Sequence, residues 1–319
     1  MDLSIVIVNW NSADFLDQAV TSLKANVLGL TYEIVVIDSG SFDGSGEMLG
    51  RNHPAVRFIQ SAANLGFGRA NNKAVSRTRG RVLLFLNPDT LVMTDAVQSM
   101  YHALVATTGG GIFGPQLLNE DGTIQQTCIR AFPTLLNQVL DSNLLRTRFP
   151  GSRLWGTAHL HESGRQPVRV DAVSGACLMI KRAQFDAIGG FSSDYFMYGE
   201  DMDLCMKANR AGLGVYYLAM AAVIHFGGKS SAKAQANTFS AVMRVESQWR
   251  FFRKHQSAAY AAGYRASMFA AGALRVIGLL CYWPLQVLRD GAWAPPTAVG
   301  KWCARLRWSL GGERWVRKF

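Results

Sequence analysis

Three carboxylates stand close together in the stretch YGEDMDLC, at Glu200, Asp201 and Asp203. Helical spacing over 200–212 places Asp201 on the apolar side of a predicted helix, among neighbours such as Leu204. Burial raises the pKa of a carboxylate and makes it a better general base. Asp201 is therefore the candidate catalytic base, and Glu200 is expected to support it from the edge of the same side.

Asp203 falls on the opposite, charged side of this predicted helix, near Lys207 and Arg210. An exposed pair spaced four residues apart stabilises a helix by a few tenths of a kcal/mol. We therefore expect Asp203 to be exposed and its loss to matter less than the loss of Asp201. For all three carboxylates the alternative is a favourable interaction with the positive end of the helix in its first turn.

A second set of polar side chains stands where predicted strands end. Asp38 ends the apolar run YEIVVID. A carboxylate there can accept from a ribose hydroxyl or from the N3–H of a pyrimidine base. Alternatively, it caps a helix that begins near Asp43.

Asp89 follows another apolar run, in FLNPDT, and His225 ends the run AAVIHF. A carboxylate such as Asp89 suits Mg²⁺ or Mn²⁺, which usually also takes substrate phosphates. Its alternative is a cap for a helix at 94–106. His225 is either a ligand or a core histidine, and Lys229, four residues later, either contacts a phosphate or is solvated.

These side chains need elements that bring them together. Apolar runs alternate with helical patterns, which predicts an α/β fold with a mostly parallel, doubly wound sheet. Ligands bind such a sheet at the carboxyl ends of its strands. The predicted strands are 3–10, 32–38, 55–60, 81–87, 111–114, 171–180, 214–218 and 222–226. The predicted helices are 13–27, 43–51, 68–79, 94–106, 182–188 and 200–212.

Several familiar ligand motifs are incomplete. GFGRAN lacks the third glycine of a nicotinamide dinucleotide turn and follows the third predicted strand rather than the first. GGKSS lacks the first glycine of a phosphate loop, because Val223 stands there. DSGSFDGSGEML has Asp43 where a calcium loop needs its turn glycine. The five cysteines are scattered without a CxxC pair, which argues against a disulfide framework and a thiolate zinc site.

The charge of the chain is concentrated at its C-terminal end. Residues 1–230 carry 19 Lys and Arg against 19 Asp and Glu, whereas residues 231–319 carry 14 against 3 and six of the eight tryptophans. This predicts a globular domain at 1–235 and a helical, basic, Trp-rich region at 236–319. The charge-free stretch 276–288 is too short to span a bilayer. An interfacial helix on an anionic membrane surface fits better. The alternatives are a helical subdomain or a transmembrane helix, and no recognition motif points to nucleic acid.

An ordered set of motifs resembles glycosyltransferase family 2, especially its bacterial rhamnosyltransferase-like members. The motifs are SIVIVNWN, VIDSGSFDGS, NLGFGRANN, LFLNPDT, SGACLMIKRAQFDAIGGFSSDYFMYGEDMDLCMKANRAG and VIHFGGKS. The resemblance covers residues 3–230. It implies a Rossmann-like GT-A fold, with a nucleotide-sugar half at 1–95 and an acceptor half at 96–235.

The resemblance also assigns roles by position. Asp201 resembles the family's catalytic base, with Glu200 beside it, and Gly175 and Tyr198 fall in the donor and acceptor pocket. Asp89 resembles the metal-binding acid, with His225 near the metal and diphosphate. Asn87 replaces the first acid of the DxD motif, which leaves one carboxylate for the metal. The residues implied in nucleotide-sugar binding are Asn9, Asn11, Asp38, Asn64, Gly66, Arg69, Asn87 and Lys229.

The implied activity is inverting transfer of a sugar, with dTDP-rhamnose as the expected donor and a lipid-linked saccharide as the expected acceptor. An inverting transferase needs one base, whereas a glycosidase needs two facing acids. The implied cofactor is Mg²⁺ or Mn²⁺, and the expected location is the cytoplasmic face of a bacterial membrane. The alternatives are a UDP-hexose or GDP-mannose donor, or a catalytically silent, membrane-bound assembly subunit.

Overall fold

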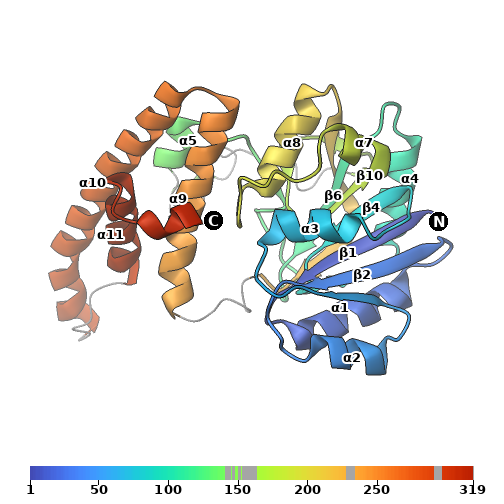
Figure 1. Ribbon diagram of the computed structural model, residues 1–319. Coiled ribbons are helices and arrows are strands. Elements are labelled where there is room, and N and C mark those ends of the chain that lie inside the picture. Colours follow the sequence, from blue (N-terminus) through green and yellow to red (C-terminus); the bar gives the residue numbers. More distant parts are fainter. Residues whose placement is uncertain are drawn as a thin grey trace. The chain divides into compact units, whose positions relative to one another are not determined.

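The computed structural model describes residues 1–140, 145, 148–149, 152, 164–227, 234–290 and 297–318. The chain divides into two compact units. The first is Met1–Phe132, Asn143–Phe196 and Glu200–Ser230, and the second is Pro133–Ser142, Met197–Gly199 and Ser231–Phe319. The first unit is built around a sheet and the second from helices (Figure 1).

The strands of the first unit are β1 (Leu3–Asn9), β2 (Tyr32–Asp38), β3 (Arg57–Gln60), β4 (Val82–Leu86), β5 (Thr90–Val92), β6 (Gly111–Leu118), β7 (Ile129–Arg130), β8 (Val168–Arg169), β9 (Ala172–Val173), β10 (Cys177–Lys181) and β11 (Gly214–His225). Within the described residues the main sheet has the order β3-β2-β1-β4-β10-β6-β11-β5, with β8 beside β11. β1 pairs in parallel with β2 and β4, and β6 with β11, whereas β10 is antiparallel to both its neighbours. The predicted mostly parallel α/β sheet is confirmed.

The helices of this unit are α1 (Ala13–Asn26), α2 (Ser45–Asn52), α3 (Phe67–Val75), α4 (Ala96–Ala106), α7 (Arg182–Ala187) and α8 (Glu200–Arg210). α1 and α2 cover one face of the sheet and α3 lies on the other (Figure 1). This change of face accompanies the reversal of strand order beside β1. Every residue of β1 and β4 is buried, as expected for apolar strands covered on both faces.

Two strand predictions differ from the structure. The predicted strand 171–180 is divided into β9 and β10, because the backbone turns between them at residues 174–176. The predicted strands 214–218 and 222–226 are one strand, β11. Its pairing with β6 shifts register between Leu218 and Ala222, so an irregularity within one strand imitates a break in the sequence pattern.

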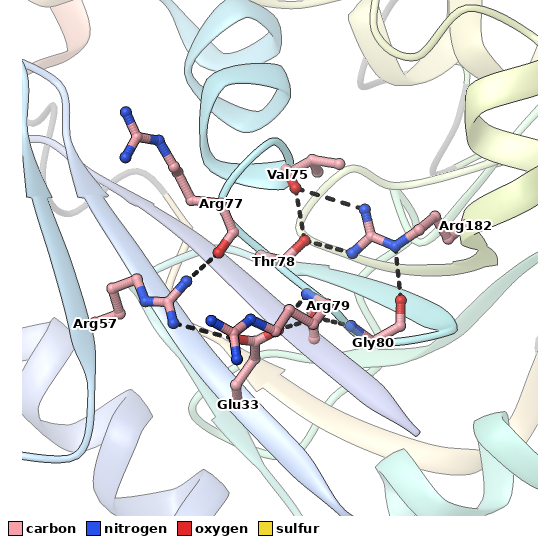
Figure 2. A network of polar contacts seen from close by, with 9 residues as sticks. Glu33, Arg57, Val75, Arg77, Thr78, Arg79, Gly80 and Arg182 are labelled. Carbon is pink, nitrogen blue, oxygen red and sulfur yellow. Dashed lines mark hydrogen bonds and ion pairs between the residues drawn. The ribbon is translucent and has the colours of Figure 1, made fainter. Parts of the chain in front are cut away.

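A polar network links neighbouring strands of the sheet at their amino ends (Figure 2). Arg182 donates to the carbonyl oxygens of Val75 and Gly80 and to the Thr78 hydroxyl, which holds the turn between α3 and β4. Glu33 accepts from the Ser4 hydroxyl at 2.8 Å. The network therefore fixes the start of β4 and, with it, the direction in which β4 reaches the opposite edge.

The second unit contains α5 (Leu135–Val139), α9 (Ala234–His255), α10 (Ala258–Asp290), α11 (Thr297–Ser309) and a short 3₁₀ helix, η3 (Arg314–Lys318). Trp308 is 1% exposed, and its indole N–H donates to Glu246 at 2.8 Å. Arg250 donates to the other oxygen of that carboxylate at 2.9 Å. The buried tryptophan is thus matched by a hydrogen-bond acceptor, and α9 and α11 are joined through it.

Candidate active site

The carboxyl ends of three strands meet at one edge of the sheet. Asn9 and Asp38 are opposite one another in the parallel pairing of β1 with β2. Asn9 Nδ2 donates to Asp38 Oδ2 at 2.7 Å, so these two predicted site residues are in direct contact. Asn87 and Asp89 follow β4, which is the other neighbour of β1.

Asp38 is fully buried and is the centre of a hydrogen-bond network. It accepts from the Ser41 backbone N–H and from Gln60 Nε2, both at 2.8 Å. Burial raises the pKa of Asp38, but hydrogen bonds from Ser41, Asn9 and Gln60 outweigh burial and hold the pKa below its ordinary value. Asp38 is therefore an ionised group that shapes the loop after β2.

The cap at the start of α2, considered above as an alternative role for Asp38, is supplied by Asp43. Asp43 accepts from the backbone N–H of Ser45, the first residue of α2, at 3.2 Å. Its other oxygen accepts from the N–H groups of Ser12 and Ala13 at 2.9 and 3.0 Å. Asp43 thus links the starts of α1 and α2, and Asp38, at the end of β2, is not needed as the cap of α2.

The loop before α3 brings Asn64 and Gly66 to the same edge. Asn64 Oδ1 accepts from the Gly66 backbone N–H at 2.9 Å and from the Ser39 hydroxyl at 3.3 Å. Gly66 has φ of +74°, and an added Cβ would lie 2.2 Å from the carbonyl oxygen of Phe196, so only glycine fits. Arg69 Nη2 donates to Ser193 O at 2.8 Å.

Asn11 is exposed and follows β1 with φ of +51°. Tyr198 belongs to the second unit, where its hydroxyl donates to the Ser240 hydroxyl at 3.1 Å and Arg244 lies 4.6 Å from its ring centre. The predicted phosphate contact Lys229 lies outside the described residues.

Asp89 and His225 converge beside Asn87. His225 Nε2 lies 3.4 Å from Asp89 Oδ1 and 3.4 Å from Asn87 Nδ2. β5 and β11 produce this meeting, because their antiparallel pairing sets His225 opposite Thr90. No group of three or more His, Cys, Asp and Glu side chains that could hold a metal occurs within the described part of the chain.

Gln125 holds His225 from the other side of the ring. Gln125 Oε1 lies 3.0 Å from His225 Nδ1, and Gln125 Nε2 donates to the His225 carbonyl oxygen at 2.6 Å. With Nδ1–H donating to Gln125, the lone pair of Nε2 faces Asp89 and Asn87. One carboxylate and one imidazole so oriented fit a divalent ion, which would complete its coordination with phosphates and water; the oxygen ligands suit Mn²⁺ or Mg²⁺, and the imidazole makes Mn²⁺ the better match.

Asp201 lies in the first turn of α8, 8% exposed. Its Oδ2 accepts from the Gly175 backbone N–H at 3.0 Å, and its Oδ1 from the Met202 N–H at 2.8 Å. An added Cβ at Gly175 would lie 3.1 Å from Asp201 Cβ, so the close approach depends on that glycine. Arg130 Nη1 approaches Oδ2 at 3.4 Å. Asp201 and the predicted pocket residue Gly175 are therefore in direct contact.

Glu200 is buried beside Asp201 but differs from it. Glu200 Oε2 has no hydrogen-bond partner in the structure. Burial and then the neighbouring charge of Asp201 raise the pKa of Glu200 to about 8. Near neutral pH Glu200 is therefore mainly protonated and is not the group that accepts a proton.

The expectation that Asp203 is exposed is wrong. Asp203 is fully buried, and its oxygens accept from the hydroxyls of Ser192 and Tyr195 at 2.5 and 3.3 Å. Lys207 Nζ lies 3.9 Å away, so the expected i,i+4 partner is present. The helical pattern indicates one apolar side, but the segment 191–196 covers the charged side as well.

Sequence reasoning missed Arg130 and Gln125. Both lie between β6 and β8, in a region where the only described strand is the two-residue β7. Single polar residues in such a segment carry no periodic signal, and their partners Asp201 and His225 are 71 and 100 residues away in sequence. Only the tertiary structure reveals them.

Comparison with known proteins accords with this geometry. The model of glycosyl transferase family 2 matches residues 4–163, half of the chain. A model described as the N-terminal domain of galactosyltransferase matches residues 159–227. Together they span the strand ends and α8, where the site residues lie.

Two curated relatives are rhamnosyltransferases. The N-acetylglucosaminyl-diphospho-decaprenol L-rhamnosyltransferase of Mycobacterium tuberculosis is 26% identical over 285 residues, which is 86% of this chain and 91% of the relative. Rhamnosyltransferase WbbL of Escherichia coli K12 is 25% identical over 232 residues, 70% of this chain and 82% of the relative.

Solved structures share the fold at low identity. Mannosyltransferase PcManGT from Pyrobaculum calidifontis, in complex with GDP-Man and Mn²⁺, has a TM-score of 0.57 at 16% identity and covers 97% of this chain and 86% of its own. GalNAc-T7 with UDP, GalNAc and Mn²⁺ has the same score and identity and covers 79% of this chain and 48% of its own. Family model, relatives and architecture agree: this chain belongs to glycosyl transferase family 2 and is a glycosyltransferase of the GT-A fold, similar to rhamnosyltransferases.

Proposed function

We propose that this glycosyltransferase moves rhamnose from dTDP-rhamnose, with inversion, to a lipid-linked saccharide in the assembly of bacterial cell-surface polysaccharide. The observation that carries the proposal is the buried Asp201 carboxylate, held by Gly175 beside a neutralised Glu200. The two rhamnosyltransferase relatives support the sugar. The name of the mycobacterial relative supports an acceptor of the N-acetylglucosaminyl-diphospho-polyprenol type.

The reaction is a single displacement. The acceptor hydroxyl attacks the anomeric carbon, and Asp201 takes its proton as the new C–O bond forms. The bond to the nucleotide diphosphate breaks on the opposite side, which inverts the anomeric carbon. A single carboxylate base suffices, because the leaving diphosphate departs as an anion and needs its charge neutralised rather than a proton.

Asp89 and His225 would hold a divalent ion, and Asn87 lies within reach of the same place. A bound Mg²⁺ or Mn²⁺ supplies charge neutralisation for the departing diphosphate. Gln125 orients the His225 ring, and Asp38 and Asn64 shape the loops that would enclose the nucleotide. The Mn²⁺ in the two structural neighbours supports the kind of ion.

The second unit is the proposed membrane contact. Residues Ala258–Pro284 of α10 are long and apolar enough to cross a membrane by length and composition, which alone is weak evidence, and 17% of their most apolar window is buried. Leu274, Ile277 and Leu288 are 72%, 58% and 84% exposed. Apolar side chains on a basic unit suit an interfacial position on an anionic cytoplasmic leaflet.

Transfer can be tested with the full chain, dTDP-rhamnose and a short-chain N-acetylglucosaminyl-diphospho lipid. The expected product carries rhamnose in the configuration opposite to that of the donor, as read by NMR. Product of retained configuration would contradict the single displacement. UDP-hexoses and GDP-mannose in the same assay test the rival donors. If no donor is transferred or hydrolysed and no nucleotide binds, the silent assembly subunit is favoured.

Membrane contact can be tested by co-sedimentation with phosphatidylglycerol-containing vesicles. The double variant Leu274→Ser, Ile277→Ser should bind about tenfold more weakly, because each loses apolar area that the interface would bury. Leu28→Ser is the control, since Leu28 is 66% exposed in the first unit. Equal sedimentation of the wild type and the double variant would contradict the interfacial contact.

A further inference from the structure

Arg130 is the cation beside the Glu200–Asp201 pair. Its Nη1 lies 3.4 Å from Asp201 Oδ2, and its side chain is 41% exposed. A guanidinium has five N–H donors, and this contact uses one. No other hydrogen bond or ion pair of this guanidinium is found among the described residues. Most of its donors are therefore available to a ligand.

Asp201 does not depend on Arg130 for its position. Backbone N–H groups of Gly175 and Met202 already hold its two oxygens at 3.0 and 2.8 Å. A half-exposed ion pair contributes at most a small stabilisation. The ion pair with Asp201 alone gives no reason to place an arginine here.

The backbone that carries Arg130 is firmly held. The two residues before it, Cys128 and Ile129, are each 1% exposed. β7 pairs with β9, and the Ser174 N–H donates to Cys128 O at 3.1 Å. The Phe132 N–H donates to Asp171 Oδ2 at 2.9 Å. The guanidinium therefore extends from a rigid ribbon, as a preorganised binding group does.

The geometry points to Arg130 as the binding residue for the phosphate attached to the accepting sugar, the first phosphate of the acceptor's diphosphate. This inference rests on the proposed function. The accepting hydroxyl must come within about 2.6–3.2 Å of Asp201. The phosphate is carried by the same sugar ring and therefore lies within one ring width of that hydroxyl. The planar fork of arginine matches the oxygens of a phosphate.

The test compares two acceptors with the same saccharide, one a short-chain lipid diphosphate and the other a neutral alkyl glycoside. The readout is the ratio of their kcat/KM values for wild type, Arg130→Gln and Arg130→Lys. The ratio should fall about 10–100-fold in Arg130→Gln, the range of a charge-assisted hydrogen bond, and less in Arg130→Lys. Any effect exerted through Asp201 alters both acceptors alike and cancels in the ratio. Arg169→Gln, an exposed strand arginine of the same unit, should leave the ratio unchanged.

An unchanged ratio in a folded Arg130→Gln protein would overturn the inference and leave the proposed function intact. A rise in the KM of the donor with an unchanged ratio would instead assign Arg130 to the donor diphosphate. Absence of transfer by the wild type to either acceptor would overturn the proposed function and this inference together.

Discussion

Two arginines of the first unit stand at opposite edges of the sheet and differ in how their donors are used. Arg182, at the amino ends of the strands, donates through all three guanidinium nitrogens to Gly80, Val75 and Thr78 (Figure 2). Arg130, beside Asp201, makes one contact of 3.4 Å within the part of the chain that the structure describes. The first arrangement is complete and holds a turn, whereas the second keeps its donors for a ligand.

The carboxylates of the same two places show the same contrast. Glu33 accepts from the Ser4 hydroxyl and the Arg79 backbone N–H and lies 3.9 Å from Arg57. Among the described residues, one oxygen of Glu200 has no hydrogen-bond partner, and its pKa is raised to about 8. The Glu33 carboxylate is thus held by groups of the fold, whereas one oxygen of Glu200 is not held by any described residue.

The largest expected effect is on catalysis at the carboxyl edge. Asp201→Asn should lower kcat about 10²–10⁴-fold, because the amide cannot accept the proton. Nucleotide binding, measured by thermal shift, should persist. Asp186→Asn, an exposed aspartate on α7, is the matched control and should retain wild-type kcat. Turnover retained in Asp201→Asn would remove the assignment of the base.

The amino edge should respond in stability instead. Arg182→Met removes the donors for Gly80, Val75 and Thr78, and the free energy of unfolding should fall by about 3 kcal/mol. Arg130→Met should change it by less than about 1 kcal/mol. Urea unfolding measures both. Equal losses of unfolding free energy in the two variants would contradict the difference between the two edges.

Metal binding at the carboxyl ends of the strands can be measured separately from turnover. Gln125→Leu should weaken Mn²⁺ binding about 10–100-fold, because the His225 ring loses the group that orients it. The readout is calorimetric titration of Mn²⁺ with dTDP present and no acceptor. Gln126→Leu, at an exposed neighbouring position, is the control. The same affinity in both variants would deny Gln125 a positioning role.

A further expected effect is the pH dependence of stability contributed by Glu200. Its folded pKa of about 8 lies above the ordinary 4.5, so the folded state holds the proton more tightly than the unfolded state. The resulting stability is complete below about pH 4.5 and is lost as the pH rises through about 8. Glu200→Gln should therefore exceed the wild type by several kcal/mol at pH 9 in urea unfolding, with little difference at pH 4.

Glu47→Gln replaces an exposed glutamate at the start of α2 and provides the control for this prediction. It should follow the wild-type curve from pH 4 to pH 9. A wild-type curve that rises between pH 6 and pH 9 relative to that of Glu200→Gln would have the wrong sign and would contradict the raised pKa.

The sequence pattern predicted the environment of a residue correctly where a single helix or strand sets that environment. Apolar runs predicted the central strands, and strand ends predicted that Asp38 and Asp89 lie at one edge. The helical wheel placed Asp201 inward, and it is 8% exposed. The same wheel was wrong about Asp203, because burial of its side comes from Ser192 and Tyr195 on another segment.

The sequence by itself determined the alternation of strands and helices, the family and the carboxylates available for chemistry, because periodicity and motif order are properties of the chain. Only the tertiary structure decided which groups share a site. It brought Arg130 to Asp201 and Gln125 to His225, and it left one oxygen of Glu200 without a partner in the part of the chain that is described. Contacts between distant segments depend on how the sheet is assembled, and no local spacing encodes them.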